Sequence, residues 1–109
     1  MTGSSGFSLD AATIAAWADV VDDHNPLHLD PEFAARTRFG TPIVHGSLLF
    51  ALACDALQTS GTPGAVTLRF RAPVPVGSTV SVTVDGAHLR LRRGDAEPVE
   101  AHVGPEATS

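Results

Sequence analysis

The chain has 109 residues, of which 43% are hydrophobic, and this length and composition suit one small domain spanning residues 1–109. Seven arginines without a lysine and a formal net charge of −5 argue against a nucleic-acid partner, because such recognition starts from a basic surface. The single cysteine, Cys54, excludes an internal disulfide framework and a cysteine-based zinc cluster.

No apolar run approaches the roughly eighteen residues that identify a membrane-spanning helix, so we expect no membrane partner. The first six residues lack the basic and apolar regions of a signal peptide. The sequence therefore predicts a cytoplasmic protein, with flexible ends at residues 1–7 and 104–109.

The first predicted helix begins after Ser8 or Asp10, either of which can cap it. Its apolar side chains recur at helical spacing, at Ile14, Trp17, Ala18 and Val21. A turn rich in polar side chains follows this helix.

That turn is Asp23-His24-Asn25-Pro26-Leu27-His28. Pro26 fixes its own φ and pushes Asn25 out of the helical region, so Asp23 and His28 cannot share one face of a regular helix. A bend between them lets both side chains converge on one small volume, where they can exchange protons near neutral pH. The alternative is a plain turn in which a backbone carbonyl satisfies His28.

Two more helices are predicted further along the chain. Asp30-Pro31-Glu32 is typical of an N-cap, a proline at the first helical position and an acidic first turn, and this short helix should end by Gly40. From His45 to about Leu57 the sequence is apolar nearly all round, which is typical of a helix enclosed by other structure.

The second half of the chain has the period of β-strands. Apolar and polar residues alternate over 66–71, 80–84, 89–92 and 99–103, which predicts four half-buried strands. An antiparallel sheet with one apolar face, packed on an apolar helix, is an α+β arrangement in which the sheet curls around the helix.

Two segments together carry a specific resemblance to a known family. Asp23-x-Asn25-Pro26-Leu27-His28-x-Asp30-Pro31, followed by Phe39-Gly-Thr-Pro42-Ile-Val-His45-Gly46, resembles the hydratase motif of R-specific enoyl-CoA hydratases and MaoC-like dehydratases. A weaker similarity continues through residues 68–77. The resemblance implies the hot-dog fold, a curved antiparallel sheet wrapped around a central helix. Because only about ten residues precede the first predicted helix, we expect the usual N-terminal strand of that fold to be shortened or absent.

The resemblance also implies a lyase that reversibly hydrates enoyl thioesters of CoA or of an acyl-carrier protein. In that family the residues matching Asp23 and His28 hold a water and move protons, and the residue matching Asn25 orders the turn and contacts the water. The backbone N–H of Gly46, at the start of the apolar helix, would polarise the thioester carbonyl. Asp22 stands where the family commonly has glycine, and we expect its side chain to face solvent.

Three residues around the apolar helix are further candidates for substrate contact. His45 and Ser47 flank Gly46 and are assigned to substrate binding, although His45 can equally cap or pack the helix start. Cys54 lies two turns further on and either lines the acyl tunnel or fills the core as a small hydrophobe.

Charged side chains suggest two other sites. Arg69 and Arg71 either bind the phosphates of CoA or of a pantetheine arm, or stand on a solvated strand face. A metal site is not expected, because Pro26 breaks the helical spacing of the acidic and histidine side chains around the turn and no cysteine assists them. Those side chains are Asp22, Asp23, His24, His28 and Asp30. The sequence points to no cofactor.

Four strands would leave a sheet edge and apolar area open, so we expect a homodimer. Two other functions remain open. One is a different hot-dog enzyme, such as a thioesterase, cyclase or isomerase, and the other is a non-catalytic subunit that binds acyl groups or a partner.

Overall fold

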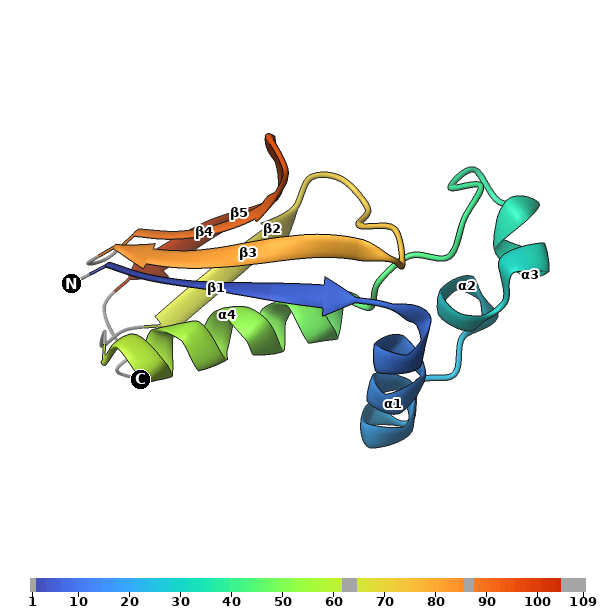
Figure 1. The fold of residues 1–109 in the computed structure, drawn as a ribbon, viewed down its shortest axis with the longest axis horizontal. Coiled ribbons are helices and arrows are strands. Elements are labelled where there is room, and N and C mark those ends of the chain that lie inside the picture. The colour runs from blue at the N-terminus through green and yellow to red at the C-terminus, as the bar shows by residue number, and fades with distance from the viewer. Residues whose placement is uncertain (1, 62–64, 86–87, 105–109) are drawn as a thin grey trace.

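The computed structural model describes residues 2–61, 65–85 and 88–104 (Figure 1). The elements are β1 (Thr2–Leu9), α1 (Ala11–Val21), α2 (Pro26–Leu29), α3 (Pro31–Ala35), α4 (Gly46–Ser60), β2 (Ala65–Phe70), β3 (Ser78–Asp85), β4 (His88–Arg93) and β5 (Ala96–Gly104). Gly104 ends β5, and the rest of the tail predicted at 104–109 lies outside the described residues.

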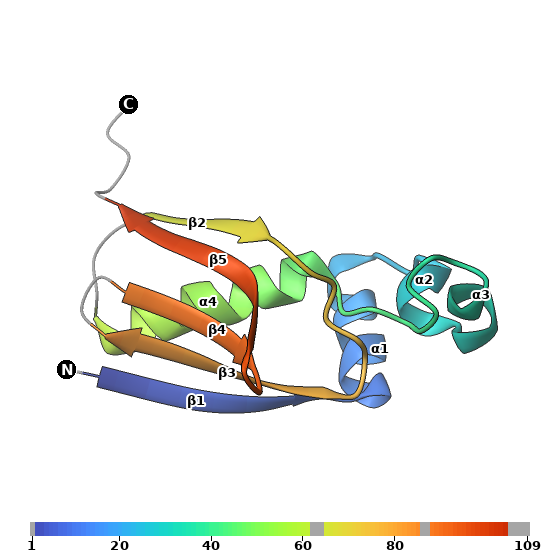
Figure 2. The same ribbon diagram turned by 90° about the horizontal axis from the view of Figure 1, so that it is seen from above.

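The strands form one antiparallel sheet in the order β1-β3-β4-β5-β2. Figure 2 shows α4 lying along one face of this sheet, with α1, α2 and α3 gathered beyond one end of it. The α+β class and the curved sheet packed on a helix are therefore as predicted. None of the described helices combines the length and hydrophobicity that would let it cross a membrane.

The first strand corrects the prediction that residues 1–7 are flexible, for residues 2–7 of that segment; residue 1 lies outside the described residues. Residues 2–9 form β1, which pairs along its whole length with β3, from Thr2 opposite Asp85 to Leu9 opposite Ser78. The Gly- and Ser-rich sequence gives no local strand signal, but β3 offers unpaired backbone groups that β1 satisfies. The N-terminal strand of the fold is therefore present, and the sheet has five strands where the sequence predicted four.

The core lies between the sheet and α4. On β3 the valines alternate inward with half-buried Ser81 and Thr83 outward, and β4 repeats the pattern with inward leucines. The buried side chains of α4 meet this surface. The cluster includes Leu48, Leu49, Ala53, Leu57, Val80, Val82, Val84, Leu89, Leu91 and Val99.

Helix α4 is covered on one side and open on the other. It continues to Ser60, three residues beyond the predicted end, and its sheet-facing residues are buried. Phe50 is 44% exposed, and Ser47 and Asp55 are also exposed. The expected enclosure of this helix is therefore incomplete in the single chain, because the sheet covers one side of it.

The helices at the end of the sheet begin where the sequence predicted. Asp10 caps α1 by accepting a hydrogen bond from the Thr13 amide at 2.8 Å, and Asp30 caps α3 by accepting from the Glu32 amide at 3.0 Å. In the segment before α4, the Val44 amide donates a hydrogen bond to the Val74 carbonyl at 2.7 Å. This bond fixes the segment to the connection between β2 and β3. These contacts fix the ends of the segments that carry the candidate site.

Candidate active site

The predicted bend between Asp23 and His28 is present. Helix α1 ends at Val21, and Asp22 takes a left-handed conformation with φ of 52° and a side chain 97% exposed. This conformation explains why a glycine suits the position, although aspartate tolerates it better than most residues. Asn25 then caps α2 by accepting a hydrogen bond from the Leu27 amide at 3.0 Å, so it orders the turn as expected.

His28 lies on α2, half buried, with its ring held by one backbone contact. Its Nδ1 lies 2.7 Å from the Ile43 carbonyl oxygen. Because a carbonyl can only accept, Nδ1 donates, and in the neutral ring Nε2 is left as the acceptor. The two alternatives for His28, a group that exchanges protons and a turn residue satisfied by a carbonyl, are therefore compatible. The carbonyl that accepts from Nδ1 also orients Nε2, which remains able to accept a proton.

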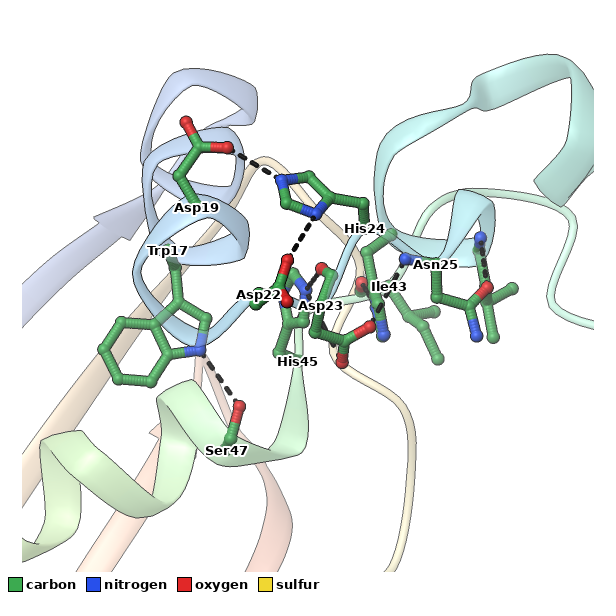
Figure 3. Close-up of polar contacts among 11 residues, drawn as sticks. Trp17, Asp19, Asp22, Asp23, His24, Asn25, Ile43, His45 and Ser47 are labelled. Atoms are coloured by element: carbon green, nitrogen blue, oxygen red, sulfur yellow. Dashed lines mark hydrogen bonds and ion pairs between the residues drawn. The ribbon is translucent and has the colours of Figure 1, made fainter.

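His45 directs its side chain toward Asp23 (Figure 3). Its Nε2 donates to the backbone carbonyl of Asp23 at 3.0 Å and lies 4.0 Å from a carboxylate oxygen of that residue. Its ring stacks on the His28 ring with centroids 3.8 Å apart and 26° between the planes. His45 occupies the N-cap position of α4 but its side chain makes no capping hydrogen bond, so capping does not explain the residue.

Asp23, His28 and His45 each offer a donor atom, and these atoms lie within 4.8 Å of one another. Such a group raises the question of a metal ion. Nitrogen lone pairs lie in the plane of an imidazole, so two nearly parallel rings 3.8 Å apart cannot both point at one ion about 2 Å away. The arrangement fits proton transfer better than metal binding.

Gly46 is the first residue of α4, where the backbone amides have no helical partner and the helix dipole favours negative charge. Phe70 fills the space beside it: a Cβ on Gly46 would lie 3.2 Å from the Phe70 ring. The alternation over 66–71 puts Phe70 on the apolar side of β2, and its ring packs over the start of α4 although the residue is 52% exposed. A pocket of about 330 Å³ opens here, lined by Gly46, Phe70, Ile43, Leu49 and Arg71 among others.

Ser47 contacts Trp17, which the sequence places among the apolar side chains of the first helix. The Trp17 indole N–H donates to the Ser47 hydroxyl oxygen at 3.0 Å (Figure 3). This bond joins the helix before Asp23 to the helix that begins at Gly46. Ser47 therefore has a structural partner, and its predicted contact with substrate stays a prediction.

The remaining candidates lie outside this cluster. Cys54 is half buried, eight residues beyond Gly46 and so about 12 Å further along the helix axis. Arg69 and Arg71 are exposed and line an open hollow of about 490 Å³ with Phe70 and Glu100. Only Arg71 of the two also lines the pocket at Gly46.

Two groups near these helices have shifted pKa values. The pKa of His24 is raised, chiefly by its hydrogen bond to Asp19 at 2.8 Å (Figure 3). This exposed pair therefore stabilises the fold at low pH and loses its effect as the pH rises through the raised pKa of His24. The pKa of Asp10 is lowered, first by the hydrogen bond from the Thr13 backbone, so that cap weakens as acid protonates the carboxylate.

Known proteins share both the sequence and the fold of this chain. Residues 3–107 match the family model described as MaoC like domain. The 3-hydroxybutyryl-CoA dehydratase of Methylorubrum extorquens is 43% identical over 86 residues, covering 74% of this chain and 55% of the relative. The (R)-specific enoyl-CoA hydratase of Aeromonas caviae is 46% identical over 85 residues, covering 73% and 63%. The chain thus spans less than two thirds of the length of these relatives.

The solved structure of the (R)-hydratase from A. caviae involved in PHA biosynthesis superposes with a TM-score of 0.83. It is 32% identical, and the match covers 94% of this chain and 91% of that one. The hot-dog fold and the family resemblance predicted from the motif are both confirmed. The chain belongs to the MaoC-like dehydratase family.

Proposed function

We propose that this chain is a lyase that reversibly hydrates an enoyl thioester to a 3-hydroxyacyl thioester, carried by CoA or by an acyl-carrier protein. The names of its relatives support the reaction class. The observation that carries the proposal is the convergence of the Asp23 carboxylate and the His28 ring within 4.8 Å, beside the first amides of α4.

A single water can bridge two polar atoms at this separation, because each hydrogen bond to it spans about 2.8 Å. In the hydration direction the water oxygen attacks C3 of the enoyl group while one member of the pair takes its proton. The α-carbon gains a proton from the acidic member, and dehydration reverses both transfers. A carboxylate and an imidazole suit this division because their ordinary pKa values differ.

The carbonyl of the thioester gathers negative charge as the α-carbon becomes enolate-like. The Gly46 amide, the first in a helix of 15 residues, is a preorganised donor for that oxygen. The pocket of about 330 Å³ beside it is lined largely by apolar side chains and suits part of an acyl thioester.

Arg71 extends this proposal to the carrier. It lines both the pocket at Gly46 and the open hollow beside Arg69, so a carrier arm that leaves the pocket through the hollow would pass its guanidinium. Arg69 borders only the hollow, which makes Arg71 the stronger candidate of the two. A cytoplasmic location stays a prediction from the sequence.

Hydration of crotonyl-CoA tests the function, followed as the loss of absorbance of the conjugated thioester. Asp23→Asn and His28→Ala should each lower kcat by about 10²–10⁴-fold, the range for a general acid or base. Asp22→Asn and His24→Gln are matched controls on the same turn with exposed side chains, and they should retain activity. A lower KM for the CoA thioester than for the pantetheine thioester, lost in Arg71→Gln, would support the phosphate contact.

Three outcomes would contradict parts of this assignment. Full turnover in Asp23→Asn or His28→Ala removes that residue from the mechanism. Release of free CoA thiol with the double bond intact identifies a thioesterase instead. Thioester binding without turnover across a panel of acyl lengths and carriers indicates a non-catalytic subunit.

A further inference from the structure

We propose that His45 is a positioning residue that holds Asp23 through its backbone and His28 through its ring. The inference rests on the proposed function of that pair. It gives a role to a buried titratable side chain that the proton transfers above do not use.

The burial of His45 is costly if packing is its only purpose. It is 1% exposed and is the sole buried polar or charged side chain in the part of the chain that the structure describes. Its Nδ1 is buried without a hydrogen-bond partner among the protein groups. An unpaired buried polar atom destabilises a fold, so a side chain needed only for packing would be apolar.

The other nitrogen fixes the position of Asp23. This residue follows the left-handed Asp22 at the end of α1, and its amide bonds back to the Ala18 carbonyl at 3.0 Å. The His45 Nε2–H holds the carbonyl of the same residue at 3.0 Å. Both backbone polar groups of Asp23 are therefore bonded, one to α1 and the other to the start of α4.

The ring of His45 fixes the orientation of His28. The bond from His28 Nδ1 to the Ile43 carbonyl sets one direction in the plane of the ring but allows rotation about that direction. The stack on His45, with centroids 3.8 Å apart, removes that rotation. Because Ile43 and His45 belong to one short segment, which the Val44 amide ties to Val74, a single segment orients His28 in both respects.

The two contacts can be separated by substitution. His45→Phe keeps an aromatic ring for the stack and loses the donor to Asp23, whereas His45→Gln keeps a donor at the place of Nε2 and loses the ring. His45→Ala removes both contacts. Ala53→Gly, at a buried position in the middle of α4, is the control for a general loss of helix stability.

We expect His45→Ala to lower kcat on crotonyl-CoA about 100-fold, the loss typical of a misplacement of about 1 Å, with little change in KM. His45→Phe and His45→Gln should each recover part of that loss. Ala53→Gly should lower the melting temperature without lowering kcat at a temperature where the protein is folded. A kcat in His45→Ala within twofold of the native value would overturn the proposal.

A second measurement does not depend on turnover. In the native protein the His45 ring should shift the carbon-bound proton resonances of the His28 ring by its ring current, and the shift should persist in His45→Phe and vanish in His45→Gln. Loss of the shift in His45→Gln but not in His45→Phe supports the stack even if no substrate is turned over, in which case the proposed function alone fails. An unchanged His28 spectrum in His45→Gln would overturn the stack as a positioning contact.

Discussion

Three histidines within a short distance differ in role because their surroundings differ. His24 is exposed and pairs with Asp19, so it acts on stability through its charge. His28 is half buried with one nitrogen bonded to a carbonyl, and the other is the nitrogen proposed to transfer a proton. His45 is buried, with its Nε2 bonded to the Asp23 carbonyl and its ring stacked on His28. Residue type alone does not separate these roles, whereas burial and partners do.

The substitution Gly46→Ala should lower hydration activity while changing the stability of the fold little. In Gly46→Ala the new Cβ would lie 3.2 Å from the ring of Phe70, which is half exposed and can move aside. Since alanine favours a helix over glycine by about 1 kcal/mol, the free energy of unfolding should change by no more than about that amount.

The same methyl would stand beside the amide proposed to bind the thioester carbonyl. Hydration activity in Gly46→Ala should therefore fall by about 100-fold, as for the loss of one oxyanion donor. Gly6→Ala is the control, because a Cβ there meets nothing within 4 Å. Full activity in Gly46→Ala, measured beside its thermal unfolding, would remove Gly46 from the mechanism.

At the scale of elements, the site is assembled where α1, α2 and the start of α4 meet. The contacts that join them link residues far apart in the chain: Trp17 with Ser47, His28 with Ile43, and Asp23 with His45. Each of these elements is short or capped locally, but the geometry of the site depends on how they are joined.

The hydrogen bond between Trp17 and Ser47 should contribute to the free energy of unfolding. Ser47→Ala and Trp17→Phe each remove the same hydrogen bond, and Ser47→Ala should cost about 1 kcal/mol, or about 4 °C in melting temperature. In the double variant the loss of this bond lowers the free energy of unfolding only once. A double-mutant cycle should therefore give a coupling energy of about 1 kcal/mol. Additive losses in chemical denaturation would show that the bond contributes nothing.

At the scale of the whole molecule, the sheet ends in two edge strands, β1 and β2, and one side of α4 stays open. Strand β2 is an edge of the sheet, and Phe70 at its end and Phe50 on the outer side of α4 are exposed. A second copy of the chain could pair with the edge and cover both rings. We therefore keep the homodimer as a prediction.

The mass in solution tests that prediction. Light scattering after size exclusion should give twice the monomer mass of 11.3 kDa. Phe50→Glu should shift the protein toward monomer because it would bury a charge in the interface. Val20→Glu changes a residue on α1 that is 74% exposed, so it should leave the dimer intact. A monomer at all concentrations, or an unaffected dimer in Phe50→Glu, would contradict the model.

The sequence by itself determined the parts of this protein that depend on neighbours in the chain. The caps at Asp10 and Asp30, the valine alternation of β3 and the bend at Pro26 follow from local backbone and burial rules, and they appear as predicted. The motif from Asp23 to Gly46 was also enough to identify the family.

Only the tertiary structure decided the rest. β1 forms because β3 offers an edge, the ring of Phe70 covers Gly46, and His45 contacts Asp23 across 22 positions of the chain. Such contacts leave no periodic or capping signal, because their stability comes from surfaces that exist only after the chain has folded. For this reason the sequence located the proposed acid and base, and the fold revealed the buried His45 side chain beside them.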